Sequence, residues 1–170
     1  MDELTTEIVT FIVNELKDTQ LGKSFDITQS KAKINELFAD ITFKLDQKSK
    51  LKVMSFMKNN TLFRQCIIPN IAKICADIRI NIDDTPYFID VIYGVYSSIN
   101  EFVQDNPTVN ISSNDLIELS GLLLKLTLVI IVQDANQLNL GISIINNTIK
   151  LVKLTVQSKK ISCKLCCCVK

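Results

Sequence analysis

Residues 112–132, SSNDLIELSGLLLKLTLVIIV, decide the fold. Ser112, with Asp115 three positions later, resembles a capping box that opens a helix. From 119 onward the segment is apolar except for Ser120, Lys125 and Thr127. It is shorter than the roughly 20 predominantly apolar residues that a membrane-spanning helix needs. We therefore predict a central, buried helix near residues 113–133, with one apolar row formed by Leu116, Leu119, Leu123, Leu126 and Ile130.

The segment that follows, residues 138–156, contains a second row with steps of four and three. This spacing predicts a helix that packs against the central one, and we expect Leu123 and Ile145 to be buried. The many β-branched residues in 128–132 and 142–156 would favour strands instead. The length of the row favours the helix; its members are Leu138, Ile142, Ile145, Ile149, Val152 and Val156.

Shorter apolar rows predict further helices over 3–17, 28–46, 48–58 and 61–80, and another that begins after Asp84. Pro69 must either kink the fourth segment or begin a new helix within it. Asp84 is the expected capping residue of the fifth helix, with Pro86 in its first turn. The inward rows are Ile8, Ile12, Leu16; Ile34, Leu37, Ile41, Leu45; Leu51, Met54, Met57; Ile67, Ile71, Ile74, Ile78; and Phe88, Ile92, Val95, Ile99, Phe102.

Composition agrees with an all-α fold. The 170 residues, 47% hydrophobic and 22% charged, suffice for one globular domain. Four glycines and three prolines are few for the turns of a sandwich or barrel. We predict a single-domain bundle of about seven helices over 1–158, followed by a basic, cysteine-rich tail over 159–170. The acidic start lacks the pattern of a secretory signal, so we expect an intracellular, cytoplasmic protein.

No catalytic machinery is visible. The chain has no histidine, which excludes imidazole bases and histidine-containing zinc sites. It has no phosphate-binding glycine loop. Asp83, Asp84 and Asp90 form the densest acidic group, and helix capping accounts for the first two. We expect no enzyme activity, no cofactor and no metal.

The cysteines gather at the end of the chain, at Cys163, Cys166, Cys167 and Cys168, among Lys159, Lys160, Lys164 and Lys170. This arrangement resembles the lipid-modified tails of peripheral membrane proteins, with acylation favoured over prenylation. Partner contact or redox chemistry, and a cysteine-only metal site, are the alternatives. Cys66 and Cys75 are expected to behave as small buried hydrophobic residues.

Charge is segregated along the chain. No lysine or arginine lies between Ile80 and Leu124, whereas no acid follows Asp134. Opposite patches of this kind can dock on neighbours or on an anionic surface; the alternative is a chance difference between solvated faces. Two arginines and three tyrosines disfavour nucleic acid as a partner. The expected basic contact surface, facing no acid, comprises Lys150, Lys153, Lys159, Lys160 and Lys164; Lys44, Lys48 and Lys52 form a second basic row.

These features favour a non-catalytic structural or scaffolding protein that acts through protein contacts or self-association. The abundance of Ile, Lys and Asn resembles translation of an A+T-rich genome, which is consistent with a viral (virion) component. A peripheral membrane adaptor with an acylated basic tail on an anionic membrane is one alternative. The short helical chain with a very apolar internal helix also resembles the viral Bcl-2-like proteins, which bind partner helices in a groove. Asn139-Leu140-Gly141 is similar to part of that family's conserved turn, with Ile142 where arginine is expected.

Overall fold

The computed structural model describes the backbone of residues 3–17, 19, 27–38, 46–59, 61, 63–76 and 79–166, and the side chains of 5–17, 19, 32–37, 46, 48–58, 61, 63–76 and 79–157. Within these residues there are seven α-helices and no strand, which confirms the all-α bundle. In order they are α1 (Glu3–Lys17), α2 (Ile27–Phe38), α3 (Gln47–Asn59), α4 (Ile68–Ile74), α5 (Thr85–Asp105), α6 (Ser113–Ile131) and α7 (Ala135–Cys166). A π-helical turn, η2 (Phe63–Ile67), precedes α4, and a 3-10 turn, η3 (Ile82–Asp84), precedes α5.

The centre of the fold is α6, as the apolar run predicts. Its first turn is fixed by Ser112, whose Oγ accepts the amide hydrogen of Asp115 at 3.1 Å and donates to the Asp115 carboxylate at 2.5 Å. The helix then packs against α5, α7, α1 and α2. Leu123 and Ile145 are both buried, which confirms the prediction for the two rows.

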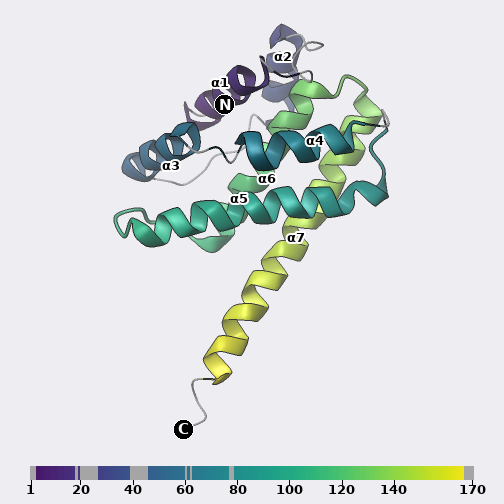
Figure 1. The fold of residues 1–170 in the computed structure, drawn as a ribbon. Coiled ribbons are helices and arrows are strands. Elements are labelled where there is room, and N and C mark those ends of the chain that lie inside the picture. The colour runs from purple at the N-terminus through teal and green to yellow at the C-terminus, as the bar shows by residue number, and fades with distance from the viewer. Residues whose placement is uncertain are drawn as a thin grey trace.

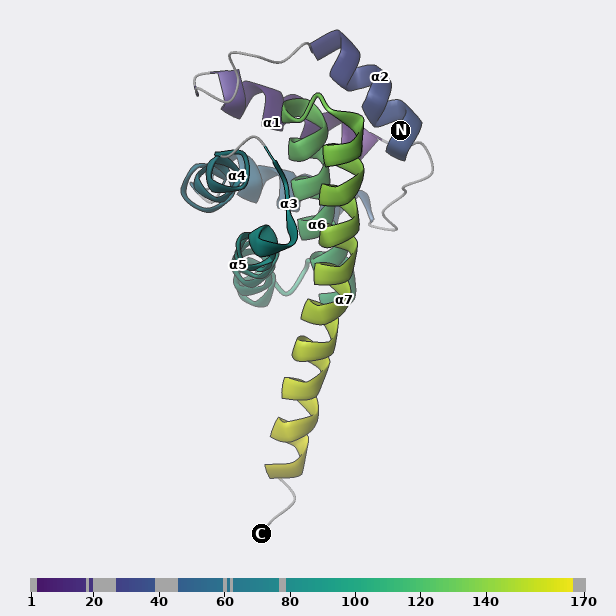
Figure 2. The ribbon, with the colours of Figure 1, turned by 90° about the vertical axis from the view of Figure 1, so that its right-hand side faces the viewer.

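Figures 1 and 2 show α6 and the first half of α7 running side by side in opposite directions, with α5 crossing them and α1 and α2 at one end. The last turns of α7 project away from the rest of the molecule in both views. Among the described helices, none combines the length and apolarity required to cross a membrane. The body of the fold consists of α1 to α6 and of α7 as far as Val156, which is still buried.

The start of α5 differs from the prediction. Asp84 makes no side-chain cap to α5. Its carboxylate instead accepts the amide hydrogen of Asn81 at 2.8 Å, while the Asn81 side chain accepts that of Asp83 at 2.7 Å. These reciprocal bonds close a capping box on η3, and Pro86 then lies in the first turn of α5. Asp84 therefore acts as a cap, as predicted, but it caps the three-residue turn η3 rather than α5.

Pro69 begins a helix rather than kinking one. Proline has no amide hydrogen and is tolerated in a first turn, and Pro69 lies in the first turn of α4 directly after η2. The predicted helix over 61–80 is too long, because α4 ends at Ile74 and both Arg79 and Ile80 lie outside any helix. Ile67, Ile71 and Ile74 are buried as predicted, while Ile78 lies outside the described residues.

Two inward rows were placed partly on the wrong side of their helices. Leu37 of α2 and Leu51 of α3 are exposed. In α3 the buried residues are Ser49, Val53, Met54 and Met57, so Met54 and Met57 of the predicted row face the core as expected and only Leu51 does not. The predicted break at Asp46 is confirmed, since its carboxylate accepts the amide hydrogen of Ser49 at 2.9 Å before α3. Ile41 and Leu45 lie outside the described residues.

Candidate functional site

The first half of α7 is anchored to the core from its first turn. The Asp134 carboxylate accepts the amide hydrogen of Gln137 at 2.8 Å, which satisfies a donor at the start of the helix. The side chain of Gln137 in turn accepts the amide hydrogen of Ile80 at 2.5 Å. These bonds tie the start of α7 to the segment that leads into α5.

Two glycines set the spacing between α6 and α7. A Cβ atom at Gly121 would lie 2.3 Å from Cδ1 of Ile149, and one at Gly141 would lie 2.9 Å from Cδ1 of Leu128. Neither position has room for a side chain, so the two helices approach more closely than larger residues would permit. Gly141 belongs to the Asn139-Leu140-Gly141 triplet, and this triplet lies within α7, near its start. The phase of α7 about its own axis is therefore fixed by contact with α6.

With this phase, α7 turns a second set of apolar residues away from the core. Leu151 is 50% exposed and Leu154 is 64% exposed, while Val152 and Val156, on the opposite side, are buried. Lys150 is exposed beside the two leucines. We call Lys150, Leu151 and Leu154 the distal stripe. It lies on turns of α7 that still pack on the core through Val152 and Val156.

Lys153 does not belong to a free basic surface. Its Nζ donates to Oε1 of Glu118 in α6 at 2.5 Å, so the expectation that it faces no acid is wrong. The two residues are 35 positions apart and meet only because α6 and α7 run antiparallel. This ion pair joins Glu118, in the acid-rich part of the chain, to Lys153, in the basic part.

Most of the predicted tail residues cannot be placed by their side chains. Five of these residues lie on the helical backbone of α7, although their side chains are outside the described residues: Lys159, Lys160, Cys163, Lys164 and Cys166. Cys167 and Cys168 lie outside the described residues entirely. Helix α7 thus continues past residue 158 into the segment predicted as a tail. Lys44 also lies outside the described residues, whereas Lys48 is exposed on α3 and Lys52 donates to the Thr108 hydroxyl.

The acid-rich segment forms an exposed surface on α5 and the turn before it. Asp83, Asp90, Glu101 and Asp105 are all exposed, and none of them forms an ion pair with a described cation. Two apolar side chains are exposed among them: Ile82 at 79% and Tyr93 at 38%. Asp90, Tyr93 and Glu101 follow one another at helical spacing, so they share one side of α5. We call these three residues the outer face of α5.

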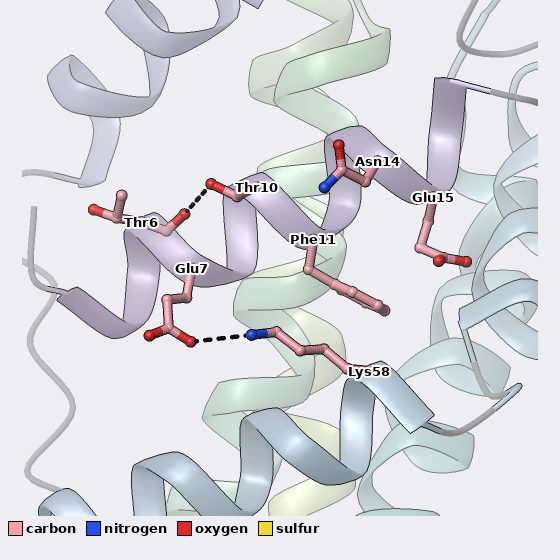
Figure 3. Close-up of a pocket in the computed structure, with 7 residues that line it drawn as sticks. All are labelled: Thr6, Glu7, Thr10, Phe11, Asn14, Glu15 and Lys58. Atoms are coloured by element: carbon pink, nitrogen blue, oxygen red, sulfur yellow. Dashed lines mark hydrogen bonds and ion pairs between the residues drawn. The ribbon is translucent and has the colours of Figure 1, made fainter.

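A pocket of about 380 Å³ opens on α1, where Lys58 of α3 reaches across to Glu7 at 3.6 Å (Figure 3). Its other carboxylate, Glu15, is held by Arg64 at 2.6 Å, so both acids in the lining are neutralised by cations. The Thr10 hydroxyl donates to the backbone oxygen of Thr6 rather than to either acid. Phe11 lies between the two glutamates and contacts Phe63 edge to face. The lining brings no nucleophile next to a base.

Burial shifts the pKa of two titratable side chains outside the pocket. Burial raises the pKa of the Cys66 thiol, and the negative charge of Asp90 adds to the rise. Burial also lowers the pKa of Lys125, with Glu118 opposing the shift. Cys66 and Cys75 are both half-buried, so they are less buried than predicted. A half-buried thiol with a raised pKa is a poor nucleophile.

The distal stripe was missed because the sequence was read for one apolar row per helix. Residues 138–156 contain two apolar rows, and only the longer one, which faces the core, was predicted. The signal was present, since Leu151 and Leu154 interrupt the polar side of a helix that otherwise carries Asn146, Asn147 and Lys150. Comparisons of the chain with protein-family models, with curated proteins and with solved structures find no match.

Proposed function

We infer that this chain is a non-catalytic structural protein that works by docking the distal stripe of α7 on another protein in a larger assembly. The observation that carries the proposal is the position of two leucines, more than half of their combined surface open, on the outward side of turns of α7 whose inward side is buried at Val152 and Val156. Exposed apolar side chains grouped with a cation are typical of contact surfaces, in which the apolar part supplies affinity and the charge supplies specificity.

The stripe is rigidly presented. Helix α7 is 32 residues long and its first half is clamped to α6 at Gly121 and Gly141. A pre-ordered helix loses little conformational entropy when a partner binds, which favours useful affinity from a small surface. The charge segregation supports a scaffolding role, because unlike patches on one molecule can organise neighbours.

The test is site-specific photo-crosslinking in cells that express the protein. A photoreactive residue at position 154 should give a discrete protein adduct, and the same residue at Lys48, exposed on α3, should not. The proposal fails if position 154 gives no protein adduct that position 48 lacks.

The alternative function, a membrane adaptor, makes a different prediction, and the same experiment tests it. If the basic, cysteine-rich end holds the protein on an anionic membrane, position 154 should label lipid, and changing Cys166, Cys167 and Cys168 to Ser should move the protein to the soluble fraction. A single acyl chain binds membranes only marginally, so loss of three cysteines would suffice for release. Under the assembly proposal the Ser variant partitions as the unchanged protein does.

A further inference from the structure

We propose that the partner of the distal stripe is a second copy of this chain, and that the stripe docks on the outer face of α5 of that copy. This inference rests on the proposed function and names its partner. The two surfaces are complementary in kind: the stripe offers one cation and two leucines, whereas the outer face of α5 offers two carboxylates and a tyrosine ring, with Ile82 exposed nearby.

Charge complementarity points to this pairing. The outer face belongs to a stretch of 43 positions, between Ile80 and Leu124, without lysine or arginine, while every charged residue after Asp134 is a lysine. In the described part of the chain, Asp90 and Glu101 have no cation of their own. Carboxylates without a local partner remain available to the Lys150 ammonium of another molecule, and the attraction speeds and orients the encounter.

The same charges argue against a symmetric contact between two α7 helices. Two distal stripes would bring lysines only against lysines, and like charges facing one another oppose association. Within one molecule the stripe and the outer face of α5 are both exposed, so they do not cover each other. In a pair of copies, the distal stripe of one can cover the outer face of α5 of the other. The formal net charge of +1 leaves little long-range repulsion between the copies.

A contact between two different surfaces has a structural consequence. After two copies pair, one retains an unused α5 face and the other an unused stripe, so association continues head to tail into a ring or an open chain. The mass of the particles should therefore rise with protein concentration and fall with added salt, because exposed charges are screened.

The experiment uses two variants of the full chain, each with one surface blocked. The stripe variant carries Lys150→Glu and Leu154→Glu; the face variant carries Asp90→Lys and Glu101→Lys. A matched control carries Lys48→Glu and Leu51→Glu, which makes the same change on the exposed side of α3, where Leu51 is 57% exposed. Circular dichroism and thermal melting establish that all variants fold.

Light scattering after size exclusion gives the result. The unchanged chain and the control should form concentration-dependent species larger than 19.2 kDa. Each blocked variant alone should self-associate at least about tenfold more weakly, since several favourable contacts become repulsive. An equimolar mixture of the two should associate again, because the intact stripe of one variant meets the intact α5 face of the other, and the glutamates of the altered stripe oppose the lysines of the altered face.

Three outcomes would overturn the inference: a monomeric unchanged chain up to high concentration at low salt, blocked variants that associate like the control, or a mixture that stays monomeric. A monomeric chain whose position 154 still crosslinks to another protein in cells would remove the second copy as partner and leave the proposed function standing. Binding of the unchanged monomer to phosphatidylserine vesicles, lost in the stripe variant, would overturn the inference in favour of a membrane.

Discussion

Replacing Gly121 by alanine tests the closest approach between α6 and α7. Alanine is favoured over glycine in a helix interior by about 1 kcal/mol. Against this, the new Cβ would lie 2.3 Å from Cδ1 and 2.8 Å from Cγ1 of Ile149, and Ile149 is itself buried in the core. Overpacking of a dense core costs about 1–3 kcal/mol. We expect Gly121→Ala to lower the free energy of unfolding by roughly 1 kcal/mol, the difference between these terms.

Gly94 on α5 provides the matched control. A Cβ there would meet only Sγ of Cys66, at 2.9 Å, and that sulfur ends a half-buried side chain that can turn aside. Gly94→Ala keeps the gain in helix propensity with little packing loss, so its stability should stay level or rise by up to about 1 kcal/mol. Urea unfolding followed by circular dichroism measures both, and a loss of 1 kcal/mol moves the midpoint by about 0.3–1 M.

A double-mutant cycle with Ile149→Val identifies the atom responsible. Valine lacks Cδ1, the nearest atom to the new methyl group, and the change alone should cost about 0.5–1.5 kcal/mol. In the Gly121→Ala background the methyl group occupies the vacated volume, so the double variant should be more stable than the sum of the two losses by about 1 kcal/mol. Additivity of the two changes would refute the packing argument at this contact.

Four further changes probe the core, the distal stripe, the ion pair between α6 and α7, and a half-buried charge. Leu123→Ala should lower the free energy of unfolding by about 2–5 kcal/mol, whereas Leu154→Ala on the distal stripe should stay within about 0.5 kcal/mol of the unchanged protein. Glu118→Gln removes the ion pair with Lys153 and should cost less than about 1 kcal/mol, with the difference shrinking in 1 M salt. Lys125→Met should raise the urea midpoint at pH 7. Burial depresses the pKa of Lys125 in the folded state, so its charge destabilises the fold below that pKa and ceases to do so as the pH rises to the unfolded value of 10.5. The midpoint gain should therefore vanish toward that pH; a gain that persists there would mean that packing alone is responsible.

The sequence predicted most reliably where the apolar pattern was long and uninterrupted. Leu123 and Ile145 lie in the middle of rows that extend over several turns, and both are buried. The shorter helices α2 and α3 contain only three to four turns, so each predicted row has few members to fix its ends. Leu51 is exposed although Met54 and Met57 of the same row are buried, and Val53 lies with them in the core. Local periodicity fixes a helix better than it fixes which side faces inward.

Contacts between distant segments were beyond the sequence. The pair of Lys153 with Glu118 depends on the antiparallel alignment of α6 and α7, which no local pattern specifies. Asp84 was read correctly as a capping residue but assigned to the wrong element, because the three-residue turn η3 is too short to leave a periodic signal. The outer face of α5 was foreseen as a block of acids and not as a surface with apolar side chains, since the exposure of Ile82 and Tyr93 follows from packing elsewhere.

The long α7 also acts as a lever. At a rise of 1.5 Å per residue, the ten steps from Val156, which is still buried, to Cys166 measure about 15 Å. A sideways load on the far end is thus multiplied into torque at the α6–α7 contact, which serves as the fulcrum. At Gly121 and Gly141 side chains of Ile149 and Leu128 pack directly on the glycine backbone, so bending at the tip strains the centre of the fold before it disturbs α1 or α2.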